Sequence, residues 1–231
     1  MQNGKCIFFW QFIPQWQRFL FSALILLVTL TFTLIGLTTG RFQVNIVNAN
    51  LSVQRGLGQI ELFLPLVAMI TLILVRLLKT THILIRMGSR VKTARQILCY
   101  LVVLVGMTTL VAWLIWLFAV SLFSRMDQVK VVFVANINFI MNMITALFTY
   151  TALTLIACLV IKSQAAGVFC GLSFVLVLYV APAFGIVEMV TPQLVLDAIW
   201  KVQVLKQILL MGVSAGLLVG VLTRTRLPVE V

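Results

Sequence analysis

Few residues in this chain of 231 residues could carry out chemistry. His82 is the only histidine, and it lies in a basic segment without a neighbouring acid, which is typical of a solvated side chain rather than a general base. The sequence has no zinc-protease pattern, no G-x-S-x-G turn and no paired carboxylates within an apolar run. We therefore expect that the chain is not catalytic by itself.

Cofactor sites are equally sparse. The four cysteines do not pair by spacing with one another or with the histidine as a metal site requires, so we expect structural thiols and no metal. The phosphate-binding pattern G-x-x-x-x-G-K-[ST] is also missing. The sequence therefore predicts no cofactor in this chain, and any ATP and magnesium that drive its function must be bound by a separate subunit.

The segment of residues 79–95 is the most basic in the chain. Apolar residues alternate there with cations, a pattern that predicts a short surface helix with one face toward the membrane and one toward a partner. A second interpretation is that the cations only set the membrane topology and contact anionic lipid. The candidate residues for partner contact are His82, Arg86, Ser89, Arg90, Lys92 and Arg95.

Glycines recur at every fourth position near the C-terminus. Gly212, Gly216 and Gly220 give one small face on which another helix can approach closely, and Gly167 and Gly171 repeat the spacing once. This pattern predicts helix packing, either within the chain or against another subunit.

The composition indicates whether water or a lipid bilayer surrounds the chain. Of all residues 62% are hydrophobic and 10% are charged, which leaves too little polar surface to cover a soluble globule. The net charge of +12 comes from cations between apolar runs rather than from a basic face with interleaved aromatics, so we do not expect nucleic-acid binding. The sequence predicts a single membrane domain over residues 1–231.

The apolar runs predict an all-α polytopic membrane protein with six transmembrane helices. Each run is long enough to cross a hydrocarbon core of about 30 Å. An N-terminal interfacial helix is expected at residues 6–17, where Phe and Trp are interrupted by Gln and Pro. The predicted spans are residues 19–39, 60–78, 97–123, 132–161, 167–187 and 205–222.

The distribution of cations predicts the orientation. Lys and Arg concentrate in the segments that share a side with the N-terminus, which favours both termini in the cytoplasm. The polar stretches 40–58 and 188–203 are then external, and Glu61, Glu188 and Asp197 lie at the outer side. All four cysteines (Cys6, Cys99, Cys158 and Cys170) map to the inner half, where we expect reduced thiols.

This plan resembles the membrane subunits of type 2 ABC exporters, particularly the small permeases of Gram-positive bacteria linked to peptide efflux or bacteriocin immunity. The resemblance covers nearly the full length and lies in the interfacial segment, the six spans and the external stretch before the last span. Its sharpest local match is the run Leu84-Ile85-Arg86-Met87-Gly88-Ser89-Arg90, which is similar to the Arg-x-x-Ser-Arg run that follows the second span in such permeases.

The resemblance implies a partner set and a location. Two permeases, identical or homologous, would be clasped by two ATP-binding cassette subunits in a bacterial cytoplasmic membrane. A coupling helix near residues 82–95 would dock into the ATPase, and the outer gate would be shaped near Glu61, Glu188 and Asp197. The apolar spans suit a hydrophobic or amphipathic cargo such as a peptide or antimicrobial.

Two alternatives remain open at this point. The chain is also compatible with a substrate-binding membrane subunit of a small-molecule uptake system, which would bind its ligand within one copy. A third hypothesis is an immunity protein that binds a toxin without transport, which requires no ATPase. The identity of the substrate and the direction of transport do not follow from the residues.

Overall fold

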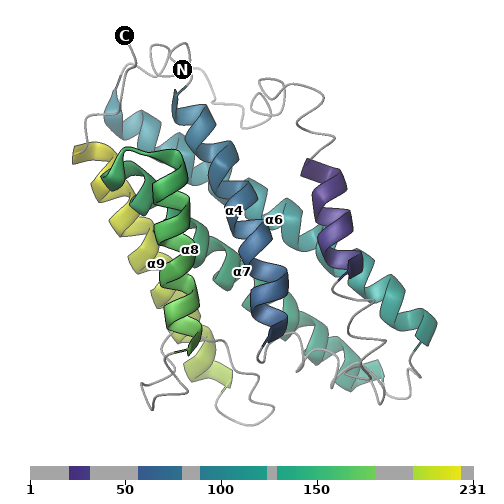
Figure 1. The fold of residues 1–231 in the computed structure, drawn as a ribbon. Helices are drawn as coiled ribbons and strands as arrows, with labels where there is room; N and C mark the ends of the chain where they lie inside the picture. Colours follow the sequence, from purple (N-terminus) through teal and green to yellow (C-terminus); the bar gives the residue numbers. More distant parts are fainter. Residues whose placement is uncertain (1–20, 32–56, 80–88, 124–128, 181–199, 225–231) are drawn as a thin grey trace, which may run out of the picture.

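Helices make up nearly all of the part of the chain that the structure describes, and this part contains no strand. The structure is a computed structural model that describes residues 21–31, 57–79, 89–123, 129–180 and 200–224. Its elements are a short helix Phe21–Thr31, α4 (Leu57–Lys79), α6 (Arg90–Phe123), α7 (Val129–Ile161), α8 (Gln164–Val180) and α9 (Trp200–Arg224) (Figure 1). The prediction of an all-α chain is confirmed for these residues.

Helix α7 lies at the centre of the bundle. It contacts α4, α6, α8 and α9, and its eight consecutive residues 145–152 are all buried. A helix that is buried over two full turns has no outward face. Small and hydroxylated side chains, such as Thr145, Ala146 and Ala152, let the neighbouring helices approach it closely.

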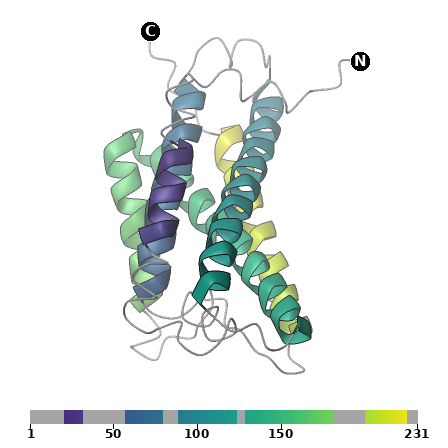
Figure 2. The same cartoon turned by 90° about the vertical axis from the view of Figure 1, so that its right-hand side faces the viewer.

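The surrounding helices bury one face each. In α6 the buried positions Ile97, Leu101, Leu104 and Val105 recur at helical spacing, while Val102 and Val103 between them are exposed. The short helix Phe21–Thr31 buries only Phe21, Ile25 and Thr29, which are four residues apart. Figure 2 shows the helices running between the same two ends of the bundle.

A two-residue turn joins α7 to α8, whereas the predicted spans 132–161 and 167–187 leave five residues between them, because α8 begins three residues earlier than predicted. Lys162 adopts φ 59°, and its backbone N–H donates to the carbonyl oxygen of Cys158 at 3.1 Å, which closes the end of α7 in a left-handed cap. Helix α8 then folds back along α7. At Gly167 an added Cβ would lie 2.8 Å from the backbone nitrogen of Cys158, and at Gly171 one would lie 2.7 Å from the Cα of Thr154.

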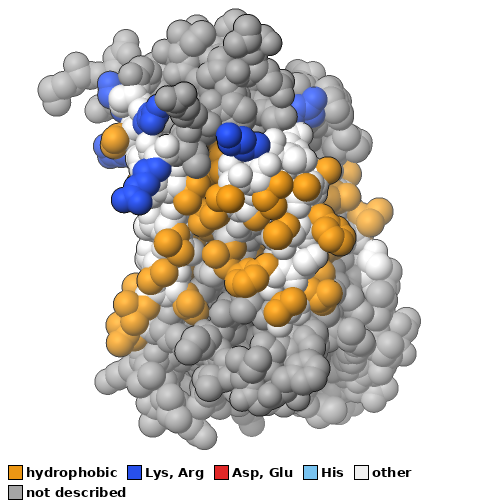
Figure 3. Space-filling view, turned by 60° about the vertical axis from the view of Figure 1, so that its left-hand side comes forward, with side chains coloured by type: hydrophobic (Ala, Val, Ile, Leu, Met, Phe, Trp, Pro, Cys, Tyr) orange, Lys and Arg blue, Asp and Glu red, His pale blue; other side chains and the backbone are white. Residues whose placement is uncertain are grey.

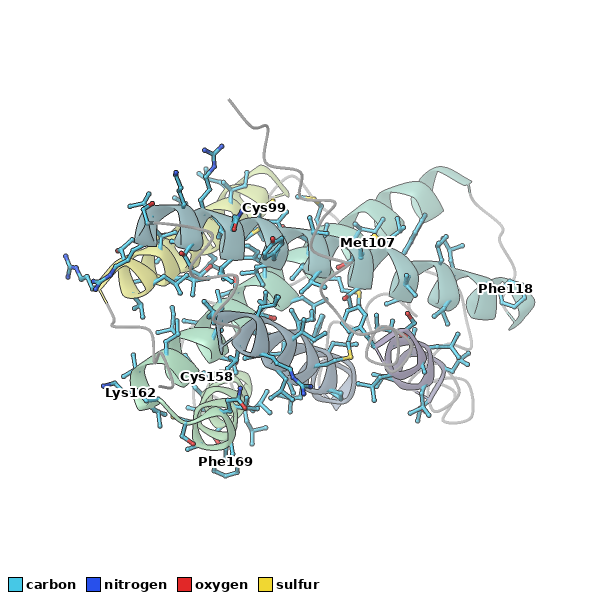
Figure 4. The ribbon with its side chains drawn as sticks, turned by 90° about the horizontal axis from the view of Figure 1, so that it is seen from above. Cys99, Met107, Phe118, Cys158, Lys162 and Phe169 are labelled. Carbon is cyan, nitrogen blue, oxygen red and sulfur yellow. The ribbon has the colours of Figure 1, made fainter. Side chains whose placement is uncertain are left out.

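Three helices of the described part are long and apolar enough to cross a membrane. They are Arg90–Ile115, Met143–Ile161 and Gln207–Arg224, and shorter apolar helices run over Phe21–Thr31, Phe63–Leu78 and Gln164–Phe174. Large apolar side chains face outward, and Phe169 (Figure 4) is 75% exposed. Such a surface is typical of a membrane protein, because water disfavours large exposed apolar patches.

Several predicted boundaries differ from the observed ones. The third predicted span begins at residue 97, but α6 begins at Arg90, so the last part of the predicted basic loop is helical. The predicted external stretch 188–203 ends within α9, which begins at Trp200. The interfacial segment 6–17 lies outside the described residues, as do 40–56 and 188–199.

The contact between α7 and α8 gives a first prediction. Replacement of Gly167 by Ala places a methyl group against the backbone of Cys158, which cannot rotate away, so we expect a loss of about 1–3 kcal/mol in stability. Thermal unfolding of the purified chain in detergent measures this loss. Gly216→Ala is the matched control, because a Cβ there meets nothing within 4 Å. Equal midpoints for the two variants would contradict the packing.

Candidate functional site

The candidate site is the basic end of the bundle. Helices α4, α7 and α9 end there and α6 and α8 begin there, so segments far apart in the sequence lie at one end (Figure 1). Figure 3 shows Lys and Arg side chains at this end, above a broad band of apolar side chains. The cations with described side chains are Arg76, Arg90, Lys92, Arg95, Lys162 and Arg224.

Ser89 positions the first turns of α6. Its hydroxyl accepts a hydrogen bond from the backbone N–H of Lys92 at 3.3 Å, and its carbonyl oxygen accepts the N–H of Thr93 at 3.1 Å and the hydroxyl of Thr93 at 3.2 Å. This is an N-cap, which satisfies N–H groups that have no partner within the helix. The cap explains why α6 begins at Arg90, seven residues before the predicted span.

The first two turns of α6 are amphipathic. Thr93, Ala94 and Ile97 are buried in the bundle. The opposite face is exposed to the outside and holds Arg90, Lys92, Arg95 and Gln96. The sequence predicts a separate surface helix here, whereas residues from Arg90 onward form the start of a continuous helix of 34 residues. A force applied to these cations therefore acts on a whole helix of the bundle.

Arg90 connects the start of α6 to the end of α9. Its Nη1 donates to the backbone carbonyl oxygen of Thr223 at 3.5 Å. That carbonyl belongs to the last turn of α9, where carbonyl groups lack partners within the helix. The sequence carries no signal for this contact, because the two residues are 133 positions apart.

The other predicted site residues are placed as follows. His82 and Arg86 lie outside the described residues, as do Glu188 and Asp197. Glu61 lies in the first turns of α4, but its side chain is not among those described. The role of these five residues in coupling or gating stays a prediction.

The glycines of α9 lie on an open face. A Cβ built at Gly212, Gly216 or Gly220 would meet nothing within 4 Å, in contrast to Gly167 and Gly171 against α7. On the same outward side Val213 and Leu217 are 60% and 54% exposed. The face is therefore not used for packing by the described part of the chain.

Buried threonines form a second polar feature that sequence analysis missed. Among the side chains that the structure describes, five buried hydroxyls have no hydrogen-bond partner: those of Thr71, Thr108, Thr109, Thr149 and Thr151. Other threonines of the chain, such as Thr29 and Thr154, donate to the carbonyl four residues earlier at 2.7 and 2.8 Å. The signal was Thr within apolar runs: one in α4, an adjacent pair in α6 and several in α7.

The cysteines differ from expectation at one position. Cys158 and Cys170 are free, in agreement with reduced thiols, but Cys99 is disulfide-bonded, so the expectation of a free thiol there is wrong. Pairing depends on the separation of the Cα atoms in the fold rather than on spacing in the sequence. Among the described residues no three His, Cys, Asp or Glu side chains gather as a metal site would require.

Comparison with known proteins adds no family. Neither family models, nor curated proteins, nor solved structures match this chain. Any functional argument therefore depends on the residues and the geometry given above.

The unpartnered hydroxyls give a second prediction. A buried hydroxyl without a partner costs about 1–3 kcal/mol, so Thr71→Val and Thr109→Val should leave the unfolding midpoint in detergent unchanged or raise it. Thr145→Val is the matched control, because this hydroxyl donates to the carbonyl of Met141 at 2.8 Å and its loss costs about 1 kcal/mol. A clear destabilisation by Thr71→Val or Thr109→Val would show that these hydroxyls hold a bound polar molecule or water.

Proposed function

We propose that this chain is the membrane-spanning permease subunit of an ATP-driven ABC exporter that moves a hydrophobic or amphipathic substrate, such as a peptide or antimicrobial. The observation that carries the proposal is the start of α6. Its basic face is exposed at the end of the bundle, while Thr93, Ala94 and Ile97 anchor the same turns in the core. A motor subunit that binds this face would move α6 as a unit.

The motion would spread beyond α6 through direct contacts. Helix α6 packs against α4, α7 and α9, and Arg90 bonds the last turn of α9 at 3.5 Å. A tilt of α6 therefore changes the packing of three other helices. Coupling of two distant sites needs such a physically continuous set of contacts. The contacts must have two arrangements, one in which the substrate route faces inward and one in which it faces outward.

The proposed complex has separate motor subunits. Because the sequence lacks a phosphate-binding loop, ATP and magnesium would be bound by ATP-binding cassette partners, and the chain would not be an enzyme itself. A second permease copy or homologue would complete the substrate route. The complex would lie in the cytoplasmic membrane of a bacterium.

Six spans with both termini in the cytoplasm are part of the proposal. The cations of the described residues at the ends of α4 and α9, at the start of α6 and in the turn between α7 and α8 support a cytosolic basic end. The disulfide at Cys99 argues in the opposite direction, because disulfides are rare in the cytosol. We give the charges more weight, since they involve several helices and directly set topology.

A second candidate function has one observation in its favour. The buried, unpartnered threonine hydroxyls lie within a single copy of the chain. A substrate-binding subunit of a small-molecule uptake system would use such groups to hold a polar ligand without a second permease. A non-transport immunity protein remains compatible with the fold, but the structure supplies no feature that favours it.

Gentle purification from the native membrane tests the assignment. Mass spectrometry should identify an ATP-binding subunit in near-equal amount, and a second permease beside it would make the complex a heterodimer. Recovery of the chain with a small ligand and no ATPase would favour the uptake subunit. Recovery with a toxin alone would favour the immunity protein.

Charge reversal at the basic face gives a third prediction. We expect Arg86→Glu together with Arg90→Glu to abolish transport-coupled ATP hydrolysis in the reconstituted complex, because the reversal removes two of the cations proposed to contact the motor subunit. Lys162→Glu, at the turn between α7 and α8, is the matched control and should keep hydrolysis close to wild type. Membrane insertion of all variants is checked by fractionation. Unchanged hydrolysis in the double variant would contradict the coupling role.

A further inference from the structure

We infer that the corner between α6 and α9 binds an anionic phospholipid, with its phosphate at Arg90 and Arg224 and an acyl chain along the glycine face of α9. This inference requires that the chain lies in a membrane, and it does not require that the chain exports anything. It concerns a ligand site that shares Arg90 with the proposed motor contact and extends from there along α9.

The corner joins the start of α6 to the end of α9, and each of these ends carries an exposed arginine. Arg90 is the first residue of α6, and it bonds to the carbonyl of Thr223, the residue that precedes Arg224 at the end of α9. Both arginines are exposed. A guanidinium has five N–H donors, and the contact with Thr223 uses one, so Arg90 keeps donors for a phosphate.

The positive charge in the first turn of α6 has no counter-charge within that turn. Lys92 follows Arg90 in the first turn of α6, and that turn contains no acidic residue. Cations at a helix N-terminus are unfavourable, because the helix dipole is positive there. The whole chain has 5 acids against 17 Lys and Arg, so an external anion must supply most of the neutralising charge.

The surroundings place the corner at headgroup depth. Val91, between the two cations of α6, is 68% exposed, and the outward face of α9 below Arg224 carries Val213 and Leu217, 60% and 54% exposed. In Figure 3 the cations lie directly above the band of apolar side chains. A basic group above an apolar surface fits a lipid headgroup better than a soluble anion.

The glycines of α9 lead to the same corner. Gly212, Gly216 and Gly220 are four residues apart, and the next position in this row is Arg224. A Cβ at any of the three glycines would meet nothing within 4 Å. The row therefore offers a shallow track for an acyl chain that ends at a guanidinium, which is the arrangement of tail and headgroup in a phospholipid.

Charge also favours a lipid over a second copy on this face. Two copies in one membrane share an orientation, so a symmetric pair of α9 helices would bring the two Arg224 side chains, and the two Arg90 side chains, toward each other. Like charges at such a contact are destabilising. An anionic headgroup neutralises the same residues instead.

Lipid binding to the purified full-length chain tests the inference. Native mass spectrometry should show that the delipidated wild-type chain retains phosphatidylglycerol in preference to phosphatidylcholine. Arg90→Gln and Arg224→Gln should each lower this preference by about fivefold. Lys162→Gln is the matched control, because it removes the same charge at the turn between α7 and α8 (Figure 4), and it should retain the wild-type preference. An equal fall in all three variants, or no preference in the wild type, would overturn the inference.

Two further variants and competition by inorganic phosphate distinguish a bound phospholipid from a free anion and from a second copy of the chain. Gly216→Leu fills the open track without changing charge, and it should also reduce phosphatidylglycerol retention. Displacement of the lipid by millimolar inorganic phosphate would reveal a site for a free anion and would overturn the lipid assignment. Disulfide crosslinking of Gly216→Cys into a dimer within native membranes would show that a second copy occupies the face, which also overturns it. The export assignment is tested separately by ATP hydrolysis, so the two proposals can fail independently.

Discussion

The burial of α7 on all sides is the constraint on which the rest of the bundle depends. Residues 145–152 have no outward face, so α4, α6, α8 and α9 must each cover one side of this helix. Close approach is possible because α7 presents Thr and Ala there, and because α8 presents Gly167 and Gly171 to Cys158 and Thr154. In a membrane this packing matters more than apolar burial, since lipid tails solvate Leu as well as a protein core does.

The same arrangement determines what remains available for function. The inward face of α6 is used by the core, so its first turns can present cations only outward. Helix α9 buries Gln207, Ser214, Leu218 and Leu222 toward the bundle and leaves its glycine row uncovered. The contact of Arg90 with Thr223 joins the start of α6 to the end of α9. The exposed charges of α6 therefore lie next to the end of the open glycine face of α9. Coupling to a motor and binding of lipid would use neighbouring surfaces of one corner.

Much of the fold follows from the sequence. Apolar runs predict the helices, and the small-residue spacing of Gly167 and Gly171 predicts close helix packing. The boundaries are less predictable. The start of α6 depends on the Ser89 cap and on the burial of Thr93 and Ala94, which make a basic segment helical although its composition is that of a loop.

The site is less predictable than the fold. Composition identifies Arg90, Lys92 and Arg95 as exposed cations, but it cannot indicate that Arg90 contacts Thr223, because only the packing of α6 against α9 brings them together. Glycine spacing cannot distinguish a row that packs against another helix from a row that is open. The glycines of α8 pack against α7, whereas those of α9 lie on an open face. The unpartnered hydroxyls of α4, α6 and α7 likewise depend on which residues surround each threonine.

The central claim is that the basic end of a membrane-embedded bundle faces the cytosol, and impermeant thiol labelling tests it most directly. In a cysteine-free background, Ser163→Cys at the turn between α7 and α8 and Ser124→Cys beyond the end of α6 report on the two ends. The account predicts that in intact cells the reagent labels Ser124→Cys and reaches Ser163→Cys only after permeabilisation. Labelling of Ser163→Cys in intact cells would show that the basic end faces the outside of the cell. That topology would agree with an oxidising environment at Cys99, and it would contradict a cytosolic motor contact at α6.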